Sequence, residues 1–382
     1  MSEAQPEAPL RRGWTTGACA SGAARAAFDA LLTGAFPDPV PVALPKRIKP
    51  EFALAIQELG DDWARAGIVK DAGDDPDVTH GALIVASVRF APRGAGVSFR
   101  AGEGVGTVTR PGLPLPPGEP AINPAPRQMI RDALAELAAA HRREPDAVVE
   151  ISIPGGEALA ERTLNARLGI VGGLSILGTT GVVVPYSCSA WIHSIHSGVD
   201  VARASGCVHV GAATGDTSEA AIRDHHHLPD HALIDMGDFA GGLLKYLRTH
   251  PIQRVTVAGG PAKMTKLAEG RLDLHSKRGA VDLPALAARV TDAGGAPSLA
   301  EAIAGANSAL HAFELAAASG FDLPALIAEG AWRSAARVLA GAPTELEIVV
   351  VGRDGRILAS SGFRPVQAQS PFHSGALGSR TS

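Results

Sequence analysis

Three short loops in the second half of the chain carry residue types suited to a nucleotide-like ligand. They are rich in glycine, hydroxyl and carboxylate groups, and they span residues 211–217 (GAATGDT), 235–238 (DMGD) and 259–263 (GGPAK). Glycine lets backbone amides approach a ligand closely, and a carboxylate commonly grips the ribose hydroxyls of adenosine. We therefore predict a cofactor site made by Gly211, Thr214, Gly215, Asp235, Asp238, Gly259 and Gly260. The alternative is that the glycines only close short turns, since the pattern is not the G-x-G-x-x-G fingerprint.

The third of these loops leads into a helix that we expect to begin at Pro261, with Lys263 in its first turn. A helix N-terminus attracts anions, and Lys263 together with Lys266 adds positive charge for a carboxylate. We predict that Lys263 binds a carboxylate arm of the substrate.

In the first half of the chain, two hydroxyl-rich tripeptides echo each other. Thr15 and Thr16 precede Gly17, and Thr179 and Thr180 precede a second glycine. Their hydroxyls and backbone amides could hold carboxylates, so we predict that all four threonines contact the substrate. The alternative for the first tripeptide is a helix cap, and for the second a turn.

Arginines stand in or beside glycine- and proline-rich loops of the same half, at positions 110, 127, 162 and 167. Arginine binds carboxylates through two parallel hydrogen bonds, so clustered arginines would suit a ligand with many carboxylates. Because one exposed ion pair contributes little, we expect Arg110, Arg127 and Lys263 to act on the substrate together. Solvated surface positions are the alternative for each arginine alone.

The remaining reactive residue types give weaker signals. His225, His226, His227 and His231 suggest a metal site, but no cysteine or carboxylate spacing supports one, so we interpret the run as an exposed loop without a metal. Cys19 lies in an alanine-rich segment and is interpreted as a core residue. Acidic side chains at positions 74, 75 and 119 are candidate acids, with solvated loops as the alternative. No catalytic residue can be named.

Hydrophobic periodicity indicates how these residues are positioned. In the first half we expect helices over residues 15–34 and from 126, and strands at 40–44, 52–56, 83–90 and 148–153. A helix over 189–205 follows. Then strands at 208–210, 232–236 and 255–258 alternate with helices from 219, 241 and 261, which is typical of a parallel sheet with crossover helices. A helix over 298–318, opened by Ser298 and Glu301, and a hairpin of 346–351 with 356–359 complete the chain.

The chain of 382 residues is too long for one ordinary core, so we predict two domains, at 11–195 and 196–364, between disordered ends at 1–10 and 365–382. A net charge of -4 argues against a general nucleic-acid binder. No segment is apolar for long enough to span a membrane. Three widely separated cysteines form no disulfide framework, which favours a cytoplasmic location. The oligomeric state stays open, with a homo-oligomer as one alternative.

The motifs occur in a fixed order over nearly the whole chain. The stretches are 13–20 (GWTTGACA), 73–79 (GDDPDVT), 102–112 (GEGVGTVTRPG), 118–123 (GEPAIN), 153–157 (IPGGE), 163–181 (TLNARLGIVGGLSILGTTG), 236–239 (MGDF) and 263–276. Together they resemble the cobalt-precorrin-5B (C1)-methyltransferase family of anaerobic cobalamin biosynthesis. Two stretches depart from the family pattern. Residues 259–263 (GGPAK) stand where Gly-His-x-Gly-Lys is usual, so that Gly260 replaces the His, and Leu274 stands where a threonine is usual. Roles for that His and Thr therefore cannot be transferred.

The resemblance implies an α/β enzyme of two domains: an α+β first domain resembling the second domain of ribosomal protein S5, and a Rossmann-like second domain. It implies methylation of carbon 1 of cobalt-precorrin-5B by S-adenosyl-L-methionine, giving cobalt-precorrin-6A, with the tetrapyrrole as the small-molecule partner. Cobalt would arrive inside the substrate, so no protein metal site is expected. Two alternatives stay open: a nucleotide-dependent oxidoreductase of the same pathway, which would bind NADPH, and a tetrapyrrole carrier without catalytic activity.

Overall fold

The structure is a computed structural model that describes residues 9–276 and 279–366. The chain divides into two compact units, residues 1–190 and 191–382. Both units combine helices and strands, which confirms the α/β class. The expected disordered ends, 1–10 and 365–382, lie almost entirely outside the described residues.

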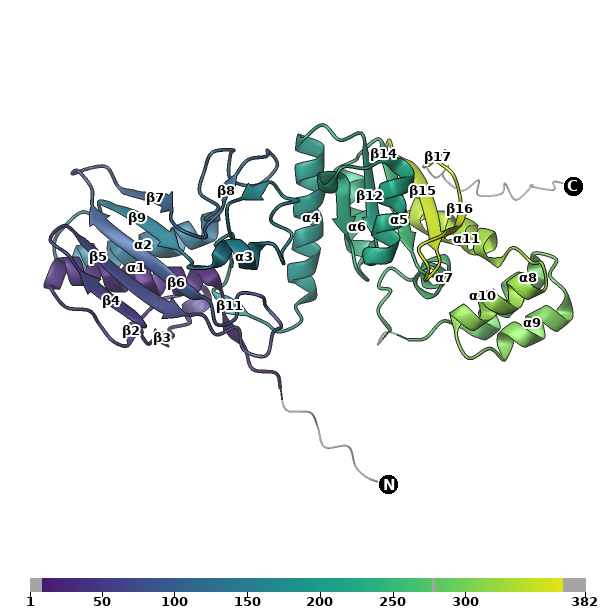
Figure 1. Cartoon of the computed structure of the whole chain (residues 1–382), viewed down its shortest axis with the longest axis horizontal. Coiled ribbons are helices and arrows are strands. Elements are labelled where there is room, and N and C mark those ends of the chain that lie inside the picture. Colours follow the sequence, from purple (N-terminus) through teal and green to yellow (C-terminus); the bar gives the residue numbers. More distant parts are fainter. Residues whose placement is uncertain (1–8, 277–278, 367–382) are drawn as a thin grey trace, which may run out of the picture. The chain divides into compact units, whose positions relative to one another are not determined.

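Unit 1 is built on a five-stranded sheet with two long helices packed against it (Figure 1). The strands, in their order across the sheet, are β4 (Ile56–Leu59), β5 (Trp63–Val69), β6 (Leu83–Phe90), β9 (Ala147–Ser152) and β7 (Val97–Ala101). Neighbours are antiparallel except β7, which runs parallel to β9. The helices are α1 (Thr16–Thr33) and α2 (Pro124–Ala140). This arrangement confirms the α+β character expected for the first half.

Alternation of side chains along the strands explains this packing. In β5 every second residue, Ala64, Ala66 and Ile68, is buried in the same core as α1. The helix contributes mainly alanines, which are small enough for helix and sheet to approach closely. Cys19 belongs to this core, as expected from the sequence.

Short strands and glycine-rich loops add a further part to unit 1. Its elements are β1 (Gly13–Trp14) paired with β11 (Val182–Val183), β2 (Val40–Pro41) paired with β3 (Glu51–Phe52), β8 (Thr107–Val108) paired with β10 (Ile170–Val171), the 3-10 helix η1 (Pro45–Arg47) and α3 (Gly156–Ala160). These pairings bring the motif stretches 102–123 and 163–181 together. The observed strands β2 and β3 are shorter than the strands predicted at 40–44 and 52–56.

Unit 2 contains the predicted parallel sheet. Its four parallel strands, in their order across the sheet, are β13 (Leu233–Asp235), β12 (His209–Ala213), β14 (Arg254–Gly259) and β15 (Glu345–Val351). The antiparallel strands β16 (Ile357–Ser360) and β17 (Arg364–Pro365) pair with β15, which confirms the predicted hairpin. The helices are α4 (Cys188–Ala204), α5 (Asp216–His226), α6 (Ala240–Thr249), α7 (Pro261–Ala268), α8 (Leu283–Asp292), α9 (Pro297–Ala304), α10 (Ala309–Ala318) and α11 (Leu323–Leu339), with the 3-10 helix η2 (Asp230–Ala232).

The predicted helix over 298–318 is wrong, because the chain breaks between α9 and α10. Gly305 ends α9, and Ser308 begins α10 by accepting a hydrogen bond from the amide of His311. Ser298 does not cap α9, whose first turn is preceded by Ala296. Helices α8 and α11 and strands β5 and β7 were not predicted from the sequence. Among the described residues, no helix is both long enough and apolar enough to cross a membrane.

Candidate functional site

The order of the parallel strands creates a switch point between β12 and β14. The chain leaves β12 toward β13 on one side of it and returns to β14 on the other side. In open parallel sheets, ligands bind beyond the carboxyl ends of the strands at such a point. Two of the three predicted loops begin there: Thr214 directly follows β12, and Gly260 directly follows β14.

These two loops are in direct contact. The amide of Thr214 donates a hydrogen bond of 3.0 Å to the carbonyl of Ala258. A Cβ atom on Gly259 would lie 2.7 Å from the Thr214 hydroxyl and 2.7 Å from the Met264 methyl group. Glycine is therefore required at position 259 by packing within the protein, rather than by a ligand.

Lys263 connects all three loops. Its Nζ donates a hydrogen bond of 2.7 Å to the carbonyl of Thr214, and it lies 3.2 Å from the Asp238 carboxylate. Asp238 belongs to the loop that follows β13, and its own carbonyl accepts a hydrogen bond from Leu274. Lys263, predicted as a substrate ligand, thus sits among the residues predicted for the cofactor.

Gly215 and Gly260 border space that no protein atom fills. Gly215 precedes α5 and Gly260 precedes α7. A Cβ on Gly215 would meet nothing within 4 Å, and one on Gly260 would meet only the carbonyl of Val351, at 4.0 Å. Because both glycines adjoin a helix N-terminus, ligand atoms carrying negative charge could approach backbone amides there.

Two residues of these loops have structural positions instead. Gly211 lies inside β12, where a Cβ would collide with Ile222 and Leu228, so the expected flexible loop at 211–217 is wrong at its start. Lys266 is buried, and its Nζ donates to the carbonyls of Leu274 and His275. Neither Gly211 nor the Lys266 side chain is therefore open to a ligand.

The loop after β13 is closed by its own carboxylate and covered by an aromatic ring. Asp235 accepts a hydrogen bond of 3.2 Å from the amide of Gly237. The indole of Trp191 donates to the Asp235 carbonyl at 3.3 Å and lies against Gly237. Trp191 exposes 45% of its surface. The sequence pattern does not indicate Trp191, because only tertiary contact links this helical residue to the loop.

In unit 1 the two hydroxyl-rich tripeptides lie side by side, but most of their hydroxyls are used within the protein. Thr15 caps α1 by accepting from Ala18, and its amide donates to the carbonyl of Gly181. The Thr16 hydroxyl bonds both the carbonyl and the amide of Leu177. Both residues are buried, which favours the capping interpretation.

In the second tripeptide, the Thr180 hydroxyl hydrogen-bonds the backbone of Val182. Thr179 is exposed and therefore available for a ligand contact.

Of the two arginines predicted to bind substrate, one is used within the protein and the other is available to a ligand. Arg127 donates to the carboxylate of Glu119 at 2.9 Å and to the carbonyls of Pro120 and Ile122. It therefore holds the 118–123 loop. Arg110 lays its aliphatic chain over Gly169, and its guanidinium has no hydrogen bond or ion pair with the residues that the structure describes.

The acidic loop at 71–79 is held by internal contacts. The Arg11 guanidinium bonds the Asp71 carboxylate and, with the Gly73 amide, lowers the pKa of Asp71 to about 2. Burial opposes ionisation of Asp77, but the buried Lys70 ammonium 2.7 Å away lowers the pKa of Asp77 overall. Asp74 and Asp75 accept hydrogen bonds from the amides of Arg11 and Tyr186. All four carboxylates thus accept hydrogen bonds from within the protein.

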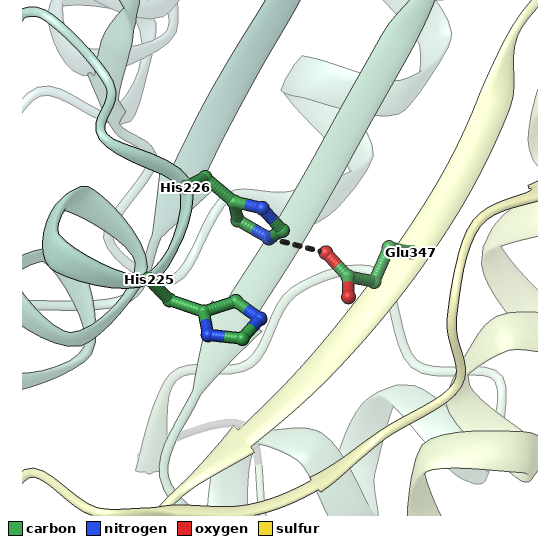
Figure 2. A group of neighbouring side chains, drawn as sticks. All are labelled: His225, His226 and Glu347. Carbon is green, nitrogen blue, oxygen red and sulfur yellow. Dashed lines mark hydrogen bonds and ion pairs between the residues drawn. The ribbon is translucent and has the colours of Figure 1, made fainter.

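The histidine run is not the exposed loop that the sequence suggested. His225 and His226 end α5, while His227 follows it as an exposed cap residue. His226 is mostly buried and lies 2.7 Å from the buried carboxylate of Glu347 (Figure 2). Burial first, and then the neighbouring His226, lowers the pKa of His209 to about 4.

Comparisons with known proteins point to the same family for both halves of the chain. The sequence matches the family CbiD over residues 3–185 and the family CbiD, C-terminal domain, over residues 273–362. A cobalt-precorrin-5B C(1)-methyltransferase of Agrobacterium fabrum is 59% identical over 97% of this chain and 98% of that protein. One from Bradyrhizobium is 60% identical over 92% of this chain and 93% of that protein.

Among solved structures, a cobalamin biosynthesis protein (cbiD) from Archaeoglobus fulgidus is 28% identical, covering 70% of this chain and 83% of that chain, with a TM-score of 0.38.

Proposed function

We infer the reaction from the premise that this chain belongs to the CbiD family. Relatives that share about three fifths of its residues over nearly its whole length are named cobalt-precorrin-5B C(1)-methyltransferase. The chain is accordingly a methyltransferase of cobalamin biosynthesis that acts on carbon 1 of cobalt-precorrin-5B. This agreement in sequence is the observation that carries the assignment.

We propose that S-adenosyl-L-methionine binds at the switch point of unit 2. The support is the group of Thr214, Asp238 and Lys263, which three separate strand ends bring into contact. Gly215 and Gly260 add open space beside two helix N-termini. Backbone amides there suit the carboxylate of the amino-acid portion, and Asp238 suits a hydroxyl or ammonium group.

Trp191 gives this site an apolar wall. Its exposed ring lies on Gly237, beside the loop that carries Asp235 and Asp238. Aromatic rings favour stacked or edge contacts with other rings, and such contacts are worth about 0.5–1.5 kcal/mol beyond the buried area. We propose that Trp191 contacts the adenine ring.

The bound cofactor would supply an already activated sulfonium methyl group. The protein must then hold the acceptor carbon in line and keep water away. In unit 1 we assign the carboxylate arms of the substrate to Arg110 and Thr179, whose polar groups are available. No proton transfer is assigned to a side chain.

A labelling experiment tests the reaction. Purified protein is incubated with cobalt-precorrin-5B and methyl-labelled S-adenosyl-L-methionine, and the product is analysed for label on carbon 1. Calorimetry with S-adenosylhomocysteine and with NADPH tests the site separately. Binding of NADPH instead of S-adenosylhomocysteine would contradict the proposal and favour an oxidoreductase. The cytoplasmic location and the oligomeric state stay predictions of the sequence.

A further inference from the structure

A second polar group of unit 2 lies away from the proposed cofactor site. Among the residues that the structure describes, His225, His226 and Glu347 form the one group of three whose ligand atoms could hold a metal ion (Figure 2). The two histidines end α5, whose first residue, Asp216, adjoins Gly215. A helix of 11 residues is about 16 Å long, so the group and the cofactor loops are at opposite ends of α5.

We propose that His225, His226 and Glu347 bind a zinc ion. Imidazole nitrogens and a carboxylate oxygen are ligands that zinc accepts, and three protein ligands leave the fourth position for water. The ligand atoms of the three residues lie within 4.8 Å of one another. The distance between His226 Nε2 and Glu347 Oε2 is 2.7 Å.

These distances are close to what a zinc site needs. With metal–ligand distances of about 2.0–2.2 Å, ligand atoms around a tetrahedral zinc ion lie about 3.3 Å apart. The pair His226–Glu347 would open slightly to admit the ion. His225 would move inward, which its exposed position at the end of α5 allows. No movement of the sheet is required.

The carboxylate is already fixed by two hydroxyls. The Thr256 hydroxyl lies 2.8 Å from Glu347 Oε2, and the Ser360 hydroxyl lies 2.6 Å from Oε1. Metal sites typically orient their ligands through such outer hydrogen bonds. Glu347 is only 3% exposed, so its charge is not stabilised by water and gains from a cation at this place.

Without a metal, the same residues could act as a hydrogen-bonded tie between α5 and β15. The two roles differ at His225. The tie consists of His226, Glu347 and their hydroxyl partners and does not need His225, whereas a zinc site does. His227 and Glu345 serve as matched controls. His227 is the next residue in the chain and is exposed, and Glu345 lies on the same strand but pairs with Arg254.

The experiment uses the full chain, stripped of metal with a chelator. Zinc binding is measured by calorimetry, and cobalt(II) binding by its visible absorption, which reports the coordination number. We expect one equivalent of zinc per chain and a four-coordinate cobalt spectrum. His225→Ala and Glu347→Gln should each weaken binding at least about tenfold. His227→Ala and Glu345→Gln should leave it unchanged. Zinc should also raise the melting temperature of the wild type but not of His225→Ala.

Three results would overturn the proposal: no stoichiometric zinc binding by the wild type, binding that survives in His225→Ala, or binding that is lost in His227→Ala. His225 is exposed, so its replacement keeps the test valid even if Glu347→Gln does not fold.

Discussion

The loops of unit 1 and those of unit 2 look equally suited to ligands in sequence, yet the structure uses them differently. In unit 1 the side chains of Thr15, Thr16 and Arg127 are buried or hydrogen-bonded within the protein. In unit 2, Gly215 and Gly260 border open space, and Lys263 and Asp238 stay partly exposed. A motif can thus be diagnostic of a family either because it binds a ligand or because it builds the loop that does.

The difference has a physical cause. A buried polar group needs a hydrogen-bond partner, and in irregular loops side chains supply the partners that a sheet would otherwise provide. Unit 1 has long irregular segments at 102–123 and 163–181, so many polar residues of its motif stretches are needed for folding. Unit 2 passes from strand to helix in two residues at Thr214 and Gly215, which leaves backbone amides at the helix ends available.

The strongest test of this contrast is Gly260→Val. The backbone of Gly260 has an ordinary φ of -72°, so a side chain there is not strained and projects into the open space. We expect S-adenosylhomocysteine to bind roughly 100-fold more weakly, about 2.7 kcal/mol, as measured by calorimetry. Gly305→Val, at the end of α9 with φ -90°, is the control and should bind normally. Unchanged affinity in Gly260→Val would place the cofactor elsewhere.

The second test separates the two arginines of unit 1. Arg127→Met should lower the free energy of unfolding by about 1–3 kcal/mol, because Glu119 and two carbonyls lose a charged donor. Arg110→Met should leave stability unchanged and raise the KM for the substrate. Denaturant unfolding and steady-state kinetics measure the two effects. The contrast fails if Arg110→Met is the destabilising variant.

A third test concerns the charge that joins the loops of unit 2. Asp238→Asn keeps the shape of the side chain but removes the partner of Lys263. We expect affinity for S-adenosylhomocysteine to fall about tenfold, since a charge-assisted hydrogen bond is worth roughly 1.5–3 kcal/mol and part of it is screened by solvent. The exposed Asp292→Asn in α8 is the control. Equal affinities in all three proteins would remove Asp238 from the site.

A fourth test asks whether Trp191 contacts the cofactor. Trp191→Ala should weaken S-adenosylhomocysteine binding about fivefold, within the range of 0.5–1.5 kcal/mol for an aromatic pair. Trp191→Phe keeps an aromatic ring and should weaken S-adenosylhomocysteine binding less than Trp191→Ala does. If both variants weaken binding equally, the hydrogen bond from the indole to Asp235, rather than stacking, is what matters.

The smallest expected effect is on thiol reactivity. Burial raises the pKa of Cys19 to about 12, so its thiol stays protonated through the range of roughly pH 7–9 in which ordinary thiols ionise. Cys188 is exposed. Iodoacetamide should therefore label Cys188 in the native protein and Cys19 only after unfolding, as peptide mass spectrometry would show. Labelling of native Cys19 would mean that the core around α1 opens readily.

The sequence by itself determined the family, the α/β class and the parallel sheet of unit 2. The ordered motifs are specific, and alternation of strands and helices is a local pattern that needs no tertiary information. It also identified Thr214 and Asp238 as candidate cofactor-binding residues and Lys263 as a candidate substrate-binding residue. It failed at the break between α9 and α10, where Gly305 ends one helix and Ser308 caps the next within the predicted single helix.

Only the tertiary structure decided which polar residues are free. Arg110 and Arg127 have the same side chain, yet Arg127 is bound by Glu119 and Arg110 is not. The histidine run gained a buried carboxylate partner from Glu347, more than 100 residues away in the chain. Partners of this kind come from sheet register and helix packing, which bring distant residues together, and no local pattern in a single sequence records them.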